Sequence, residues 1–303
     1  MTTILFYVAG ICVFLLAIFL LERFVLAPQR RREAEAAPRI TLDEAQTFWT
    51  EIEEDALPIA KASVQARAQL SPQETRIGGA PLAIGDDKTW PMNVHDGSPL
   101  AHIVQINFAE MPPIEDFPTQ GILQIFSALE TMDETGGSDL LIRWDPDPQS
   151  VELLEIPEEL KTAKSLSRDF SKRALNEGLP LQFSTDMAIG NPYNWPHEKN
   201  DLCYQNRLPE NEETAVIMDD WEDRCTRISE GYGDHWIGGH PRFVQLDFRE
   251  YAPQFRHLDR VLFHMGSDED INVGDSGEVN VMISKDALQR RDFEKAYLFW
   301  DCS

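Results

Sequence analysis

The chain has 303 residues, of which 42% are hydrophobic, so it can hold one large domain or two small ones around a real core. Its net charge of −25 argues against nucleic acid as a partner, because phosphate contacts need clustered Lys and Arg. A basic protein or a cation fits this charge better, the alternative being an acidic surface that only keeps the chain soluble. Cys12 lies in an apolar run, so at most one disulfide could form among Cys203, Cys225 and Cys302, and no C-x-x-C pair occurs. This argues against a disulfide framework and fits a reducing compartment.

Residues 1–27 are predicted to form a transmembrane anchor. Residues 4–21 carry no charge, and as a helix they would span about 27 Å, close to the roughly 30 Å core of a bilayer. The basic run at 30–32 follows this span and no Lys or Arg precedes it, so the positive-inside rule predicts a single-pass inner (plasma) membrane protein with a cytoplasmic C-terminal domain. A cleaved secretory signal is the alternative, since AEAAP at 34–38 offers a cleavage site.

Residues 28–40 are interpreted as a tether and residues 41–303 as the folded domain. Thr41 and Glu44 have the spacing of a capping box and predict a helix start, and a second helical piece is expected to stop near Ser71. Residues 157–176 and 210–230 are also expected to be helical. The remaining apolar runs predict strands at Ala101–Phe108, Gly121–Ser127, Asp139–Trp144, Val151–Ile156, Leu179–Ser184, Arg242–Phe248, Arg260–Met265 and Glu278–Ser284. This order favours an α+β fold with largely antiparallel sheets.

One stretch of sequence occurs twice. GGAP at 78–81 precedes VQINFAE at 104–110, and GGHP at 238–241 precedes VQLDFRE at 244–250. We interpret these as two pseudo-repeated halves of one compact domain, with about twenty extra residues in the first copy. Each copy should contribute an equivalent strand whose apolar face is buried, Val104, Ile106 and Phe108 in one and Val244, Leu246 and Phe248 in the other. The alternative is a chance match between two strands.

Several motifs together resemble the YwqG-like family, a bacterial domain of unknown function. They are RIGGAP at 76–81, TWP at 89–91, HIVQINFAEMP at 102–112, GILQIF at 121–126, GGHPRFVQ at 238–245, VGDSGEVNVMIS at 273–284 and DFEKAYLFWDCS at 292–303. The resemblance covers roughly residues 45–303 and implies a compact α+β domain in two halves. It implies no established activity and therefore supplies no catalytic residues.

The candidate binding residues are polar or aromatic positions in these motifs: Gln105, Gln245, Trp90, His240 and Asp275. Gln105 and Gln245 would lie on the strand face opposite the apolar one. They could line a polar groove between the halves, with Trp90 as an aromatic wall, or they could clamp neighbouring backbone. For Trp90 a place in the core is the alternative.

Motifs for catalysis or metal binding are incomplete in this chain. GDSG at 274–277 lacks the second glycine of a serine protease loop, since Glu278 follows it. The acidic stretch at 268–278 has Val273 where a calcium loop needs glycine. Asp234, His235 and His240 would need a further converging ligand to hold zinc. We therefore expect no catalytic residues, no metal and no cofactor.

The function expected from the sequence is that of a membrane-anchored cytoplasmic binding or interaction module, with a protein or peptide partner that is basic. An enzyme of unknown chemistry, such as a metal-assisted hydrolase, is the first alternative. An acidic immunity-type protein that neutralises a basic partner is the second. Three ligands converging around His235, His240 or Asp275 would favour the enzyme, and a mixed apolar pocket without them would favour the binding module.

Overall fold

The computed structural model describes residues 56–66, 70–85, 88–128, 140–162, 171–188, 234–245 and 247–302, with single positions 41, 43, 47, 50 and 54. The predicted anchor and tether lie outside the described residues, as do Leu246 and the helix expected at 210–230. In the described part, no helix is both long enough and apolar enough to cross a membrane. The four described positions between 43 and 54 are helical, in the region where a helix was predicted.

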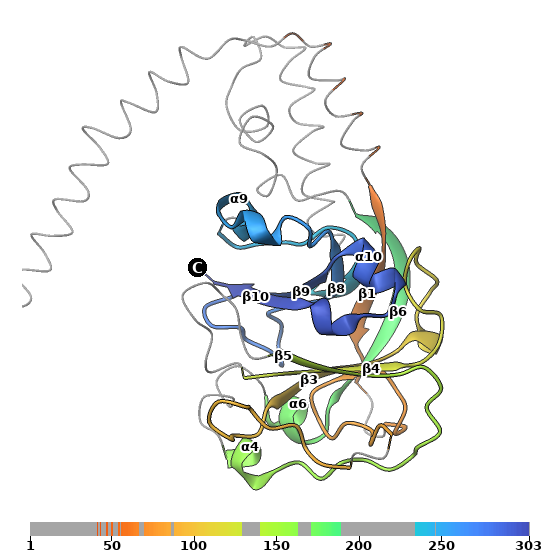
Figure 1. Ribbon diagram of the computed structural model, residues 1–303, viewed down its shortest axis with the longest axis vertical. Helices are drawn as coiled ribbons and strands as arrows, with labels where there is room; N and C mark the ends of the chain where they lie inside the picture. Colours follow the sequence, from red (N-terminus) through yellow and green to blue (C-terminus); the bar gives the residue numbers. More distant parts are fainter. Residues whose placement is uncertain are drawn as a thin grey trace, which may run out of the picture. The chain divides into compact units, whose positions relative to one another are not determined.

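The described residues build a ten-stranded sheet in the order β10-β9-β8-β7-β1-β6-β2-β3-β4-β5, with antiparallel pairing between neighbours (Figure 1). The strands are β1 Leu57–Val64, β2 Arg76–Ile77, β3 Ala101–Asn107, β4 Ile122–Ser127, β5 Leu140–Asp145, β6 Leu179–Ala188, β7 His235–Gly238, β8 Arg260–Gly266, β9 Glu278–Ile283 and β10 Tyr297–Asp301. The helices are short: η2 Phe108–Glu110, α4 Glu158–Thr162, α6 Lys172–Asn176, α9 Phe248–Tyr251, η5 Pro253–Phe255, α10 Lys285–Gln289 and η6 Phe293–Lys295.

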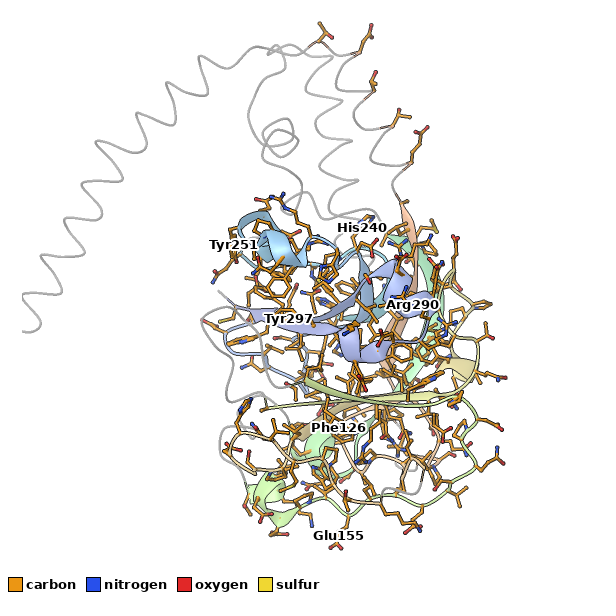
Figure 2. All side chains as sticks on the ribbon, viewed as in Figure 1. Phe126, Glu155, His240, Tyr251, Arg290 and Tyr297 are labelled. Carbon is orange, nitrogen blue, oxygen red and sulfur yellow. The ribbon has the colours of Figure 1, made fainter. Side chains whose placement is uncertain are left out.

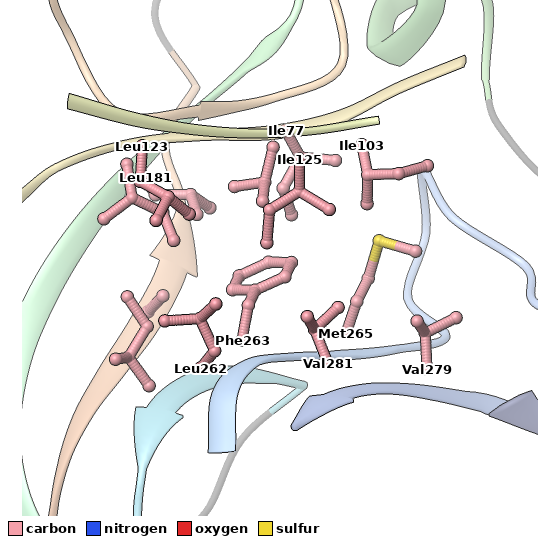
Figure 3. Packing of buried hydrophobic residues seen from close by; sticks show 14 of the residues in the cluster. Ile77, Ile103, Leu123, Ile125, Leu181, Leu262, Phe263, Met265, Val279 and Val281 are labelled. Carbon is pink, nitrogen blue, oxygen red and sulfur yellow. The ribbon is translucent and has the colours of Figure 1, made fainter. Parts of the chain in front are cut away.

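The core lies between two parts of this barrel-like sheet. Apolar side chains of β2, β3, β4 and β6 face those of β8 and β9 and form one buried cluster (Figure 3). Phe108 belongs to this cluster, and Phe248 is buried in a smaller aromatic one where its ring stacks on Phe299 at 4.3 Å. Burying a phenylalanine contributes on the order of 2 to 3 kcal/mol. The prediction that Val104, Ile106, Phe108 and Phe248 are buried is confirmed.

Six predicted strands are confirmed, with boundaries that differ by a few residues; they are β3, β4, β5, β6, β8 and β9. Three predictions are wrong. The second helical piece was expected around Val64, Ala68 and Leu70, but Val64 ends β1, a central strand that pairs with both β6 and β7 and buries Ala60 and Ala62; residues 67–69 lie outside the described residues. Val151–Ile156 is no strand, since only an isolated bridge between Leu153 and Leu82 forms there.

The third wrong prediction is the strand at Arg242–Phe248. Residues 242–245, the part of this stretch before Leu246, form no strand. Val244 and Gln245 are exposed, and Phe248 begins helix α9. Asp247 caps this helix by accepting a hydrogen bond from the backbone N–H of Arg249. The repeated VQ-x-x-F stretches therefore do not form equivalent strands, and a polar groove between Gln105 and Gln245 does not result from them.

A different correspondence between two parts of the sheet does exist. Gln105 of β3 pairs with Arg76 of β2 and Gln124 of β4, and His264 of β8 pairs with Trp236 of β7 and Asn280 of β9. Both β3 and β8 contain an irregularity three residues before this position, between His102 and Val104 and between Val261 and Phe263. The run β2 to β5 thus matches the run β7 to β10 strand by strand.

The two Gly-Gly-x-Pro turns occupy corresponding places in these runs, as expected. Gly78 and Gly79 follow β2, Gly238 ends β7 and Gly239 follows it, and all four glycines have φ between +64° and +84°. From turn to next strand the spacing is nearly the same in both runs, so the twenty extra residues inferred for the first copy do not exist. The match extends to the last strands, which end in Trp144-Asp145 and Trp300-Asp301.

Candidate functional site

Gln105 is fully buried, and its amide is hydrogen-bonded on every side. Its Oε1 accepts from the N–H of Leu82 at 2.8 Å and from Nε2 of Gln124 at 2.9 Å. Its Nε2 donates to the carbonyls of Pro72 and Glu74 at 2.9 and 3.0 Å. A side chain with all its hydrogen bonds made inside the protein clamps the backbone, so the structural interpretation of Gln105 holds.

The other polar candidates lie around the strands β7 to β10. Gln245 is exposed and its Nε2 donates to the carbonyl of Cys302 at 2.7 Å. His240 is half-buried after β7, and Figure 2 shows it well separated from Phe126 of β4. Asp275 is exposed in a turn before β9, between Gly274 and Ser276, which both have positive φ. Gln245 and the turn that holds Asp275 both lie beside Cys302, since a Cβ on Gly274 would be 3.2 Å from the Sγ of Cys302.

Trp90 is the candidate that does line a pocket. Its indole Nε1 donates to the carbonyl of Leu100 at 2.9 Å, and its ring meets Phe126 edge to face at 6.0 Å. The pocket has a volume of about 20 Å³, enough for a group of one or two water-sized atoms at its base. Its lining is mostly apolar and consists of Gly78, Gly79, Trp90, Ala101, His102, Ile156, Leu160, Lys161 and Leu175.

Helix α6 closes one side of this pocket because glycines let it approach the turn. Ser171 caps the helix by accepting from the N–H of Ala174 at 3.1 Å. The N–H of Gly79 donates to the carbonyl of Ala174 at 2.8 Å, and a Cβ on Gly78 would lie 2.2 Å from that same oxygen. No side chain can be added at Gly78 without moving the helix, so the first Gly-Gly turn fixes the shape of the pocket.

His102 is the polar group of this pocket. Its Nδ1 lies 3.0 Å from the carbonyl of Gly78 and 3.1 Å from that of Gly79, so Nδ1 carries the proton. Nε2 is buried and has no hydrogen-bond partner. Burial, with a smaller contribution from the charge of Arg76, lowers the pKa of His102 to about 3, and nearby carbonyls oppose this only in part. The imidazole is therefore neutral at pH 7, with Nε2 unprotonated and buried.

The position of His102 depends on the irregularity in β3. A simple alternation would place His102 on the same face as Val104, which is in the core. The extra residue at Ile103 shifts the register, so that Ile103 and Val104 both point to the core and His102 pairs with Phe126 across the strands. Sequence reasoning missed His102, although it stands in the quoted HIVQINF stretch, because a bulge leaves no clear signal in one sequence.

A second polar cluster occupies the corresponding place around β8 and β9. Nε of Arg242 donates to Oε1 of Glu278 at 2.5 Å, and the guanidinium lies 5.0 Å from the ring of Trp236. That ring stacks on the imidazole of His264 at 3.5 Å, whose Nδ1 lies 3.0 Å from Oδ1 of Asn280. Burial lowers the pKa of His264 well below its usual value and raises the pKa of Glu278.

His235 and Asp268 extend this cluster, with Nε2 of His235 at 3.1 Å from Oδ2 of Asp268. Burial tends to raise the pKa of Asp268, but the hydrogen bond from His235 and backbone N–H groups outweigh it and lower the pKa overall. Among the residues that the structure describes, no group of three or more His, Cys, Asp or Glu could hold a metal ion. Cys203 and Cys225 lie outside the described residues.

The fold and the site thus define a class of protein. It is an antiparallel sheet domain with a small pocket, mostly apolar but with polar residues, beside a Gly-Gly turn. The model of the family described as domain of unknown function DUF1963 matches residues 75–302, which is most of the chain. The chain belongs to this family. Comparison with curated proteins gave no match.

Proposed function

We propose that this protein is a binding module, anchored in the inner membrane with its domain in the cytoplasm, that holds a group of its partner in the pocket between Trp90 and His102. The observation that carries this proposal is the pocket itself, whose walls are mostly apolar and whose polar side chains are the neutral imidazole of His102 and Lys161. Such a lining suits recognition and lacks the converging ligands that a metal-assisted hydrolase needs. The net charge of −25 supports a basic protein or peptide as the partner.

The pocket can be tested by filling it. Ala101→Leu adds three carbon atoms at the pocket wall, and Val151→Leu, which adds one, is the control at an exposed position. A fragment library is screened by ligand-observed NMR on the full chain in nanodiscs. We expect a set of fragments to bind the wild type and Val151→Leu but to lose binding to Ala101→Leu. If no fragment distinguishes Ala101→Leu from the wild type, the pocket is not a binding site. Leu175→Phe replaces Ala101→Leu if the latter fails to fold.

The anchor and its orientation are supported by the uncharged run at 4–21 and the arginines at 30–32. A reporter that works only in the cytoplasm, fused after Ser303, should be active. Activity of a periplasm-dependent reporter at the same place would overturn both the orientation and the cytoplasmic location.

We also propose that the likeness to the YwqG-like family and the match to DUF1963 describe the same domain, built as two copies of one unit. The corresponding registers around Gln105 and His264 support this. So do the two Gly-Gly turns and the two Trp-Asp strand ends. In this proposal the copies align Gln105 with His264, and Gln245 has no part in the repeat.

A further inference from the structure

The pocket beside the first Gly-Gly turn suits a small apolar group. Its volume of about 20 Å³ gives room for one or two atoms of the size of a water molecule. Trp90, Ile156 and Leu175 line it and are half-buried, so a bound group can reach apolar side chains from the surface. The tip of a branched aliphatic side chain fits this space, whereas an aromatic ring is too large for it. Burying such a tip removes apolar area from water and thereby adds affinity.

Most of the positive charge around the pocket is already paired within the protein. Of the described cations within three residues of a lining residue, all but Lys172 have a carboxylate as counter-charge. These pairs are Lys161 with Glu158 at 3.3 Å, Lys88 with Glu152 at 2.5 Å, Arg173 with Asp270 at 3.2 Å, and buried Arg76 with Glu110. An anionic partner would therefore have to compete with these carboxylates for the cations.

Negative charge around the pocket is left unpaired. Three exposed glutamates, each within three residues of a lining residue, make no ion pair with the described part of the chain; they are Glu155, Glu159 and Glu177. The stretch 152–159, which leads into α4, holds four glutamates and no Lys or Arg. Three unpaired carboxylates against the one ammonium of Lys172 leave the surroundings of the pocket negative. They favour a partner with basic residues beside its apolar group.

We propose that the pocket binds the tip of a branched aliphatic side chain, such as isoleucine or valine, in a peptide segment whose neighbouring residues are lysine or arginine. Trp90 and Leu175 contact the aliphatic tip. Glu155 and Glu159 pair with the basic residues and select the segment. The inference rests on the proposed function, because it names the kind of peptide that the module recognises.

The test compares three short peptides that carry an uncharged fluorophore. The first has the core Lys-Ile-Lys, the second replaces isoleucine by serine, and the third replaces both lysines by glutamate. Binding is measured by fluorescence anisotropy with the full chain in nanodiscs of zwitterionic lipid, which do not attract basic peptides. We expect the Lys-Ile-Lys peptide to bind about tenfold more tightly than either of the others, and to lose binding to Ala101→Leu.

A pair of matched variants tests the role of the glutamates. Glu155→Gln/Glu159→Gln removes two carboxylates beside the pocket and should weaken binding of the Lys-Ile-Lys peptide about fivefold. Glu250→Gln/Glu294→Gln removes the same charge from exposed positions of α9 and η6, which do not line the pocket, and should bind like the wild type. Figure 2 shows Glu155 and Tyr251, the neighbour of Glu250, at opposite ends of the domain.

Other results would overturn the inference in distinguishable ways. Equal affinity for the isoleucine and serine peptides would mean that surface charge alone holds them. Equal or tighter binding of the glutamate peptide, or equal losses in the two double variants, would mean that Glu155 and Glu159 do not select the partner. Failure of all three peptides, while fragments still distinguish Ala101→Leu, would remove the inference and leave the binding module standing. Absence of any peptide or fragment sensitive to Ala101→Leu would remove the proposed function as well.

Discussion

At corresponding places in the run β2 to β5 and the run β7 to β10, a side-chain amide makes the same kind of hydrogen bond, whereas several residues around it differ. In the first run Nε2 of Gln124 donates to the carbonyl of Leu82 at 2.7 Å, and in the second Nδ2 of Asn280 donates to the carbonyl of Arg242 at 2.7 Å. Both carbonyls lie just after the proline of a Gly-Gly-x-Pro turn. The side-chain amide therefore ties the turn to the third strand of each run, although several residues around it differ between the runs.

The neighbours differ in charge. Leu82 and Ile122 stand where the second run has Arg242 and Glu278, and the charge next to Gln105 is the buried guanidinium of Arg76 on β2. The second cluster is ionic and contains the imidazole of His264, which is fully buried. The two runs share the amide tie, whereas the first run has no ion pair at the positions of Arg242 and Glu278. The ion pair in the second run should therefore be replaceable, although breaking one half of it should be costly.

The largest effect is expected from Arg242→Leu, which gives the second run the residue of the first. It leaves the carboxylate of Glu278 buried without its partner, and should reduce the free energy of unfolding by about 3 to 5 kcal/mol. Urea denaturation followed by circular dichroism measures this. The double variant Arg242→Leu/Glu278→Ile completes the exchange and should recover most of the loss. A double variant no more stable than the single one would show that the charges are required for the fold.

Gln105→Met should be the next most damaging change. It removes four hydrogen bonds and leaves the N–H of Leu82 and the carbonyls of Pro72 and Glu74 without this partner, at a cost of about 3 kcal/mol. The matched control is Gln245→Met, which loses one exposed hydrogen bond and should change stability by less than about 0.5 kcal/mol. Similar losses at the two glutamines, in the same denaturation measurement, would restore the idea that they are equivalent.

Each run also places a glycine against the tryptophan of its last strand. A Cβ on Gly121 would lie 2.4 Å from Trp144, and one on Gly274 would lie 2.9 Å from Trp300. Gly274 has φ of +59°, so Gly274→Val combines backbone strain with a clash and should cost about 2 kcal/mol in thermal unfolding. Ser276→Ala changes an exposed side chain in the same turn and should have little effect on folding or on binding. Loss of binding in Ser276→Ala, with folding intact, would point to a chemical role for this hydroxyl.

The smallest expected effect is a pH dependence from Asp301. Burial raises the pKa of Asp301 from 3.8 to about 6, although the backbone N–H groups of Gln245 and Val244 oppose the shift. The folded protein therefore holds this proton more tightly than the unfolded chain. The resulting stabilisation is complete below about pH 4 and is lost as the pH rises through about 6. Asp301→Asn should flatten the unfolding free energy in this window and stabilise the protein at pH 8 by about 1 to 2 kcal/mol. An unchanged slope between pH 4 and 6 would contradict this origin.

The sequence predicted most strands correctly because their apolar runs are bounded by turn residues. It failed at Val64, where the helical spacing of Val64, Ala68 and Leu70 suggested a helix, because Val64 ends β1, which pairs with strands on both sides. It also failed at Val244-Gln245, because a similar string of residues is not a similar structure when the flanking contacts differ. The better signal for the repeat was the pair of endings Trp144-Asp145 and Trp300-Asp301.

Of the residues that line the pocket, the sequence identified only Trp90 as a pocket wall. It also identified the first Gly-Gly turn, but not that this turn lets helix α6 approach the pocket. The place of His102 could not be inferred, because it depends on the bulge in β3 and on the approach of α6. Lys161 and Leu175 come from helices separated from β3 by more than fifty residues. Contacts of this kind follow from topology, which one sequence does not specify.

The most direct test of the binding module is photo-cross-linking in native membranes, with the anchor present. A photoreactive residue replaces Lys161 at the pocket rim and, as a control, exposed Val244. We predict that the probe at 161 gives a discrete cross-linked product, which the probe at 244 does not give and which disappears when Ala101→Leu fills the pocket. The same products from both positions, or a product at 161 that persists with Ala101→Leu, would contradict the proposal that this pocket holds the partner.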